Sequence, residues 1–252
     1  MCGRSHQRPR LADLVVGDIS MVTAPSVLVF DVNETLIDIV SMTPLFTRIF
    51  GDPRALREWF AQLVVYSMTA TIAERYTDFF TLGQAVLRML ADVHAVTITD
   101  DDLHSVKHGM LTMPAHPDVE DGLTALRDNG FRLVTLTNSP PGDPTPIEHA
   151  GLAHFFEQRF SVDACRAFKP APAVYRHVSE ELGVEPAECM MVAAHVWDTI
   201  GAQSAGLRGA LITRPGKAPL PTPDLPQPDI VAADLRELAA NLTNQAVETS
   251  TE

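Results

Sequence analysis

The chain has 252 residues, of which 46% are hydrophobic and 20% are charged, so it can form one large domain or a core domain with a smaller insertion. The formal net charge of −13 argues against nucleic acid and anionic membrane surfaces as partners, because both attract basic faces. No apolar run reaches the roughly 20 residues that a transmembrane helix needs. An anionic substrate would therefore need a local pocket of positive charge or amide groups.

The first part of the chain differs in pattern from the rest. It contains basic residues but no long apolar stretch with a small-residue cleavage site, so it is not typical of a secretory signal. We expect residues 1–24 to form a mobile leader, since globular patterning begins only after Met21. The three cysteines, Cys2, Cys165 and Cys189, have no zinc-site spacing and cannot form a disulfide framework. This usage favours a reduced, cytoplasmic protein.

A buried strand and then a long helical region follow. Residues 26–30 (SVLVF) are apolar and β-rich and lead into Asp31, which is typical of a buried parallel strand. Residues 57–76 and 81–96 carry apolar residues at three- and four-residue spacing, which predicts amphipathic helices. Thr99 with an aspartate three positions later predicts the capped start of another helix. Because no strand pattern interrupts this part, we expect residues 41–112 to form a helical cap domain.

From Pro114 onward, helical and strand patterns alternate. Helices are expected at residues 118–130, 171–183 and 198–206, and strands at residues 131–138, 189–195 and 209–213. A proline-rich surface segment at 216–229 should then lead to a last helix at 234–242. This alternation predicts an α/β fold with a doubly wound, Rossmann-like parallel sheet. The core domain would comprise residues 25–40 and 113–252, with the helical cap inserted between them.

Polar residues follow the expected strands at the edge where such sheets bind ligands. Three strands end at Asp31, at Thr137–Asn138 and at Ala194–His195. Taken alone, Asp31 could cap a helix or turn, Lys169 could be a solvated surface residue, and Asp198 could belong to an ordinary first helical turn. Each of these residues alone is weak evidence for a site. A carboxylate, a hydroxyl, a lysine and a second acid in this order, each at a strand end or helix start, are much less likely to occur together by chance.

Together these segments resemble the haloacid dehalogenase superfamily, and within it the type II 2-haloacid dehalogenases. The matching segments, in order, are FDVNETLID, RYTDF, LTNS, FKPAPAVY and the VWD of VAAHVWDTIGA. The resemblance runs from about Val27 to Leu242, and the ordered set of motifs is specific where DxxxT alone would not be. It implies a haloacid dehalogenase fold and hydrolytic dehalogenation of small 2-haloalkanoic acids to 2-hydroxy acids through an aspartyl ester. Haloacetates such as fluoroacetate are candidate substrates.

The resemblance also implies a role for each matching side chain. In chain order these are the nucleophile Asp31, its supporting hydroxyl Thr35, the substrate-carboxylate ligands Thr137 and Asn138, the cation Lys169, the supporting Tyr175, and Asp198, which orders or activates the hydrolytic water. Elementary chemistry agrees with this division. A carboxylate beside an ammonium keeps a low pKa and stays ionised, as a nucleophile must. An ester intermediate divides one difficult step into two easier ones.

The cap departs from the family pattern at one position. Phe60 stands where the family carries an arginine that helps receive the leaving halide, although Arg57 lies one helical turn earlier. Phe60, Trp59 and Trp197 would give a tighter and more aromatic pocket than an arginine does. We therefore expect Phe60 and Trp197 to contact the substrate and the pocket to favour acids of two or three carbons.

Two further departures lie next to the expected nucleophile. His195 stands where the family has an asparagine that helps position water, and Asn33–Glu34 replace an aromatic–glycine pair. We expect His195 either to orient the hydrolytic water with Asp198 or to donate an N–H to the leaving halide, since imidazole can serve both roles near neutral pH. Asn33 is a second candidate donor toward the substrate, which would matter most for a small, hard leaving group such as fluoride.

The main alternative is a hydrolase of the same superfamily that acts on a different small acid or ester, and a magnesium-dependent phosphatase is its most important case. Such phosphatases resemble one another in a DxD motif, but position 33 here is asparagine, which cannot exchange a proton as a carboxylic acid does. Their acidic pair for magnesium would begin at Ala194, which leaves only Asp198. We therefore expect no metal and no cofactor. A non-catalytic ligand-binding relative is a third possibility, although it need not have kept both Asp31 and Lys169.

The expected partners are small. They are an anionic 2-halocarboxylate substrate and the released halide, with no nucleic acid and no membrane. A homodimer is also considered, because the amphipathic segment at 81–96 could supply an interface, but the same segment could equally be buried within one chain.

Overall fold

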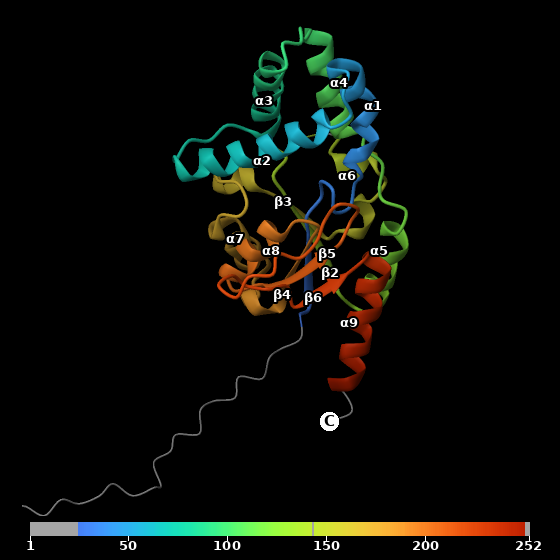
Figure 1. The fold of residues 1–252 in the computed structure, drawn as a ribbon. Coiled ribbons are helices and arrows are strands. Elements are labelled where there is room, and N and C mark those ends of the chain that lie inside the picture. Colours follow the sequence, from blue (N-terminus) through green and yellow to red (C-terminus); the bar gives the residue numbers. More distant parts are fainter. Residues whose placement is uncertain (1–24, 143, 250–252) are drawn as a thin grey trace, which may run out of the picture.

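The computed structural model describes residues 25–142 and 144–249, and in it a parallel sheet carries helices on both faces and a helical cap above one end (Figure 1). The six strands lie in the order β3-β2-β1-β4-β5-β6, and all neighbours are parallel. The strands are β1 (Val27–Phe30), β2 (Arg132–Thr137), β3 (Gln158–Ser161), β4 (Cys189–Ala193), β5 (Arg208–Ile212) and β6 (Ile230–Ala232). The predicted doubly wound α/β fold is confirmed. The leader predicted for residues 1–24 lies outside the described residues.

The centre of the sheet is the most apolar part of the chain. All four residues of β1 and all five of β4 are buried, as expected of parallel strands covered on both faces. Helices α5 (Val119–Asp128) and α9 (Leu235–Thr249) pack against each other on one side of the sheet, and α7 (Pro172–Leu182) and α8 (Val196–Ser204) lie on the other (Figure 1). The order of strands reverses between β1 and β4, which is where ligands bind in sheets of this kind.

Four long helices form the cap above the carboxyl ends of the strands (Figure 1). They are α1 (Thr43–Phe50), α2 (Ala55–Ile72), α3 (Phe79–Val93) and α4 (Asp100–Leu111). The Trp59 indole of α2 donates a hydrogen bond to the Gly83 carbonyl of α3, at 2.9 Å, and so joins the two helices. The helix start predicted at Thr99 is confirmed: Thr99 and Asp102 form a reciprocal capping box at the N-terminus of α4. The exact domain boundaries at 41 and 112 remain a prediction.

Two strands, β3 and β6, and the short α-helix α6 (Pro146–His149) were not predicted from the sequence, nor were the short 3-10 helices. The two strands are the edges of the sheet, with four and three residues. Each is paired on one side only. In β3 only Phe160 is buried, and β6 is apolar but has only three residues, so neither carries the longer apolar run that marks a buried central strand. The proline-rich segment at 216–229 lies largely on the surface, as predicted, but it leads into β6 before the last helix begins.

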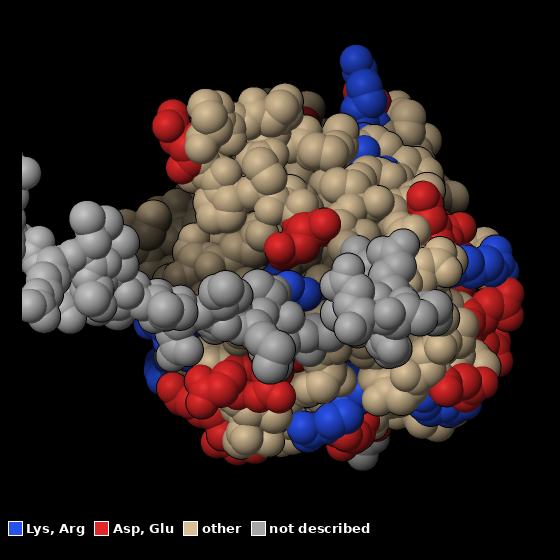
Figure 2. All heavy atoms as spheres, turned by 90° about the horizontal axis from the view of Figure 1, so that it is seen from below, with Lys and Arg blue, Asp and Glu red and all other residues tan. Residues whose placement is uncertain are grey.

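The apolar face of α3 is buried within the chain, in Val86, Leu87, Leu90 and Ala91. The apolar face of segment 81–96 is therefore buried within one chain, as the sequence allowed, and does not supply a free interface. The homodimer remains a prediction that this segment does not support. Within the described ranges, no helix combines the length and the apolar character needed to cross a membrane. Seen from the side opposite the cap, acidic and basic side chains are interspersed on the visible surface (Figure 2).

Candidate active site

The expected nucleophile lies at the edge of the sheet that faces the cap. Asp31 follows β1, Asn138 follows β2 and His195 follows β4, so three neighbouring strands deliver them to one place. The backbone N–H of Asp31 donates to the carbonyl of Val192, at 3.0 Å, which extends the pairing of β1 with β4 by one residue. These residues therefore meet at the carboxyl ends of the strands, at the point where the strand order reverses.

Asp31 is held as a carboxylate by donors on both of its oxygens. The Lys169 ammonium donates to Oδ1 at 3.0 Å, and the Thr35 hydroxyl donates to Oδ2 at 2.7 Å. Thr35 in turn accepts the backbone N–H of Ala194 at 2.9 Å, so its hydroxyl is oriented toward Asp31. Burial alone raises the pKa of Asp31, but Lys169, His195 and Thr35 outweigh it and hold the pKa well below its usual range. Asp31 is therefore ionised at neutral pH.

Lys169 lies between two buried carboxylates. Its ammonium donates to Asp198 Oδ2 at 2.8 Å as well as to Asp31, and only 1% of the residue is exposed. Burial lowers the pKa of Lys169, but the two carboxylates outweigh it and raise the pKa, so the ammonium stays charged. The Tyr175 hydroxyl donates to the other oxygen of Asp198 at 2.6 Å. Burial and then the Asp198 charge raise the pKa of Tyr175, which keeps the phenol as a donor.

Close packing fixes these groups relative to one another. The backbone N–H of Lys169 donates to the side-chain oxygen of Asn138 at 3.1 Å. Gly201 of α8 lies directly against Pro170 and Tyr175: a Cβ at that position would lie 2.8 Å from both the Pro170 carbonyl oxygen and the Tyr175 hydroxyl. A glycine in α8 therefore allows the loop that carries Lys169 to approach Asp198.

A small pocket covers Asp31, with a volume of about 10 Å³, which is room for roughly one water molecule. The cap helices α2 and α3 supply part of its wall and the core supplies the rest. Its lining residues are Asp31, Asn33, Phe60, Val64, Phe79, Asn138, His195 and Trp197. An outer pocket of about 280 Å³ adjoins it, shares four of these residues and is completed by Glu34, Arg57 and Ala61. The reacting groups are thus enclosed between cap and core.

The aromatic wall predicted for this pocket is only partly present. Phe60 and Trp197 line both pockets and each stacks against the His195 ring, with centroid distances of 6.0 and 4.8 Å. Trp59 was wrongly included in that wall, because it is fully buried inside the cap. Arg57 lies exposed in the outer pocket and does not line the inner one, so no cap arginine reaches Asp31 in its place.

His195 contacts two acids at once. Its Nε2 lies 2.7 Å from Glu34 Oε2, and its Nδ1 lies 3.6 Å from Asp31 Oδ2, too far for a hydrogen bond. Burial lowers the pKa of His195, but the adjacent Asp31 and Glu34 outweigh it and raise the pKa above its ordinary value. Nδ1 is buried in the pocket wall and has no hydrogen-bond partner within the described part of the chain, and the same is true of the Asn33 side-chain oxygen. Both atoms are therefore available to a bound molecule.

Glu34 and Lys217 were missed as members of the site. Glu34 adopts a left-handed backbone conformation with φ of 64°, and its Oε2 accepts the Lys217 ammonium at 2.9 Å as well as His195. The sequence did mark Asn33–Glu34 as a departure, but the partner lies 161 positions away. Lys217 stands in the proline-rich segment, and nothing in its neighbourhood indicates a site.

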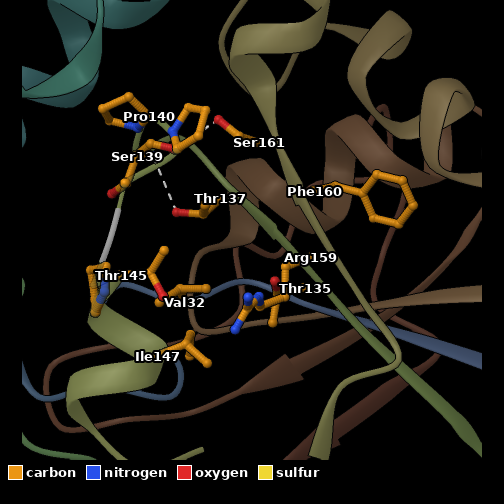
Figure 3. A pocket seen from close by; sticks show the side chains of 13 residues that line it. Val32, Thr135, Thr137, Ser139, Pro140, Thr145, Ile147, Arg159, Phe160 and Ser161 are labelled. Atoms are coloured by element: carbon orange, nitrogen blue, oxygen red, sulfur yellow. Dashed lines mark hydrogen bonds between the residues drawn. The ribbon is translucent and has the colours of Figure 1, made fainter. Parts of the chain in front are cut away.

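Thr137 is turned away from the pocket over Asp31. Its hydroxyl accepts the backbone N–H of Ser139 at 3.1 Å. It lines a separate cavity of about 200 Å³ beside Thr145 and Ile147, where Figure 3 shows the hydrogen bond to Ser139. Of the two predicted carboxylate ligands, Asn138 lines the pocket over Asp31 and Thr137 does not. The contact of Thr137 with a substrate remains a prediction.

No cluster of three or more histidine, cysteine, aspartate or glutamate side chains that could hold a metal ion occurs in residues 25–142 and 144–249. The space between Asp31 and Asp198 is filled by the Lys169 ammonium. Independence of metals and cofactors stays a prediction for the assays below.

A doubly wound parallel sheet, a helical cap and an ionised aspartate at the end of the first strand define a Rossmann-like α/β fold with a capped site. Residues 25–206 match the family model of the haloacid dehalogenase-like hydrolases, and the chain belongs to that family. The resemblance inferred from the motifs is thereby confirmed.

Known relatives agree with this assignment. The chain is 29% identical to (S)-2-haloacid dehalogenase 1 of Pseudomonas sp. (strain CBS-3) over 192 residues, which are 75% of this chain and 85% of that protein. It is 25% identical to haloacetate dehalogenase H-2 of Moraxella sp. (strain B) over 194 residues, 76% and 87% of the two chains. The solved L-2-haloacid dehalogenase of Xanthobacter autotrophicus superposes with a TM-score of 0.79 at 26% identity, covering 87% of this chain and 98% of that one.

Proposed function

We propose that this protein hydrolyses small 2-haloalkanoic acids to 2-hydroxy acids through an ester formed on Asp31. The observation that carries the proposal is the state of Asp31: an ionised carboxylate, held by Lys169 and Thr35, at the floor of an enclosed pocket. The names of the relatives, which are 2-haloacid and haloacetate dehalogenases, support the same chemistry.

In the proposed first step, a carboxylate oxygen of Asp31 attacks C2 of the substrate. The halide leaves with the electrons of the carbon–halogen bond, and C2 inverts. The Lys169 ammonium and the Thr35 hydroxyl hold Asp31 in place and keep it unprotonated. The substrate carboxylate would be received by Asn138 and, once its side chain turns toward the pocket over Asp31, by Thr137, with Asn33, Phe60 and Trp197 around the rest of the molecule.

In the proposed second step, water attacks the Cγ atom of the esterified Asp31. The 2-hydroxy acid leaves and the carboxylate is restored. Asp198, supported by Tyr175, and His195 are the residues to which the ordering or activation of this water is assigned. The Lys169 ammonium provides the positive charge between Asp31 and Asp198 that a metal would otherwise provide, so we propose a metal-independent enzyme.

The pocket supports a preference for acids of two or three carbons, haloacetates included. The space over Asp31 is about 10 Å³, so any haloacid must displace part of its wall, and a longer chain would have to displace Phe60, Phe79 and Trp197 further than a two- or three-carbon acid. One methylene in such a pocket changes transition-state binding by about 1–3 kcal/mol. We also propose a cytoplasmic location, with which the free Cys165 and Cys189 thiols are consistent.

The test is halide release, with chelator present and no added metal, from fluoroacetate, chloroacetate and each enantiomer of 2-chloropropionate. An Asp31→Asn variant and an aryl phosphate with added magnesium are run in parallel. Halide release that persists in chelator and disappears in the variant is the expected result. Phosphate release without halide release would instead assign the chain to the phosphatases of the superfamily. Activity on neither substrate class would point to a binding protein.

A further inference from the structure

Glu34 and His195 form a buried acid–imidazole pair next to the proposed nucleophile. Glu34 lies 2.7 Å from Nε2, so in the neutral ring the proton is held on that nitrogen and the lone pair of Nδ1 faces the pocket. Nδ1 has no hydrogen-bond partner among the described residues and lies 3.6 Å from Asp31 Oδ2. Stacking against Phe60 and against Trp197 further restricts rotation of the ring. An imidazole oriented by a carboxylate in this way is arranged as a general base.

Asp198 is poorly placed for the same task. One of its oxygens accepts the Tyr175 hydroxyl at 2.6 Å and the other accepts the Lys169 ammonium at 2.8 Å. The residue is fully buried and does not line the pocket over Asp31, whereas His195 does. A water molecule in that pocket would therefore contact the imidazole and not the Asp198 carboxylate.

We propose that His195 is the general base for hydrolysis of the Asp31 ester and that Glu34 is the positioning residue that aims its Nδ1 at the attacking water. This inference rests on the proposed dehalogenase function. The water oxygen bonds to Cγ of Asp31 while one water proton moves to Nδ1. The tetrahedral intermediate then breaks the bond between Cγ and the substrate oxygen, which takes the proton from Nδ1 and leaves as the 2-hydroxy acid. The second water proton stays on the regenerated Asp31 carboxyl group, which passes it to Nδ1 and becomes a carboxylate again.

Ester formation itself would prepare the base. In the free enzyme the Asp31 carboxylate faces Nδ1 of His195 and the Glu34 carboxylate faces Nε2. Both negative charges favour the protonated ring. Each acid also has a cation as partner: Lys169 forms an ion pair with Asp31, and Lys217 forms one with Glu34. Esterification removes the Asp31 charge and leaves the others, which lowers the pKa of His195 and releases its proton. The imidazole then becomes basic in the step that needs a base.

A single-turnover experiment separates the two chemical steps. Halide released in the first seconds reports ester formation, and the intact mass of the protein reports how long the ester lasts. We expect His195→Gln to release about one halide per enzyme and then to accumulate ester, with hydrolysis slowed by about 100-fold or more. Glu34→Gln should slow the same step by about tenfold or more. Glu34→Asp should recover part of that loss. Asp198→Asn should slow the halide burst more than the decay of the ester.

The pH dependence supplies a second readout that a merely structural role would not produce. Ester hydrolysis in the wild-type enzyme should accelerate as pH rises through the titration of His195, and this limb should vanish in His195→Gln. Glu58→Gln is the matched control, because Glu58 and His94 form a similar pair at 2.9 Å on the exposed surface of the cap. Its ester should decay at the wild-type rate.

Decay at the wild-type rate in His195→Gln, or accumulation of ester in Asp198→Asn alone, would overturn the inference while leaving the proposed function intact. If His195→Gln gives no halide burst, His195→Met replaces it as the test, since a burst itself proves a folded site. No halide from the wild-type enzyme would instead reject the dehalogenase function.

Discussion

Replacing Lys169 with methionine would leave two buried carboxylates, Asp31 and Asp198, without the ammonium that lies 3.0 and 2.8 Å from them. Removing one partner from a buried ionic group costs about 3–5 kcal/mol, because the remaining charge is neither solvated nor paired. For a chain of this length, that loss corresponds to a fall in Tm of about 6–20 °C. Halide release should also be abolished, since Asp31 would no longer be held as an anion.

The pH dependence of this loss has a definite sign. In the wild-type protein the pKa of Asp31 is lowered on folding, so ionised Asp31 stabilises the fold above its ordinary pKa and this contribution disappears as pH falls. Burial, together with the Asp31 charge, already raises the pKa of Asp198 above its ordinary value, and in the variant the loss of the Lys169 charge raises it further. Protonation then relieves the repulsion, so the variant should be most destabilised at neutral pH and less so near about pH 4.

Urea unfolding of both proteins at neutral and acid pH measures the difference directly. Lys107→Met is the control, because Lys107 lies exposed on α4, and its replacement should change the free energy of unfolding by less than about 0.5 kcal/mol. A Lys169→Met variant that loses less than about 1 kcal/mol, or loses the same amount at both pH values, would show that the buried carboxylates do not depend on Lys169.

Three further results are expected. Thr35→Val removes the hydroxyl bonded to Asp31 at 2.7 Å, a hydrogen bond to a charged group worth about 1.5–3 kcal/mol, so ester formation should slow by about 10- to 150-fold in single-turnover assays. Tyr175→Phe leaves one oxygen of Asp198 unpaired and should lower the free energy of unfolding in urea by about 1–3 kcal/mol; an unchanged value would contradict the bond at 2.6 Å. Because the pKa of Asp31 is lowered, the halide burst should show no acid limb from Asp31 between about pH 5 and 7, and a limb there that shifts in Thr35→Val would refute this.

The sequence predicted the centre of the sheet better than its edges, for a physical reason. The strands β1 and β4 are covered on both faces, so they must be apolar throughout and can be recognised in isolation. The edge strands have a neighbour on one side only: β3 is mostly polar, and β6 is apolar but only three residues long. Their strand conformation depends on tertiary pairing, which no local pattern encodes.

Some site residues could likewise be predicted from the sequence and others could not. Asp31, Thr35, Lys169 and Asp198 could be recognised because each lies within a motif that follows a strand or precedes a helix, and the fold brings them together as expected. The pairing of Glu34 with the histidine at 195 could not be foreseen. It depends on the left-handed turn at Glu34 and on the distance between the ends of β1 and β4, neither of which is readable along the chain.

The central claim is that Asp31 becomes covalently bound to the substrate, and isotope transfer tests it most directly. A single turnover is run with excess enzyme in water labelled with heavy oxygen, and the product and the peptide containing Asp31 are weighed by mass spectrometry. If water attacks the Asp31 ester at Cγ, the label appears in the Asp31 carboxylate and the 2-hydroxy acid carries the enzyme's original oxygen. Label found in the first-formed hydroxy acid, with none in Asp31, would mean that water displaces the halide directly and would contradict the account.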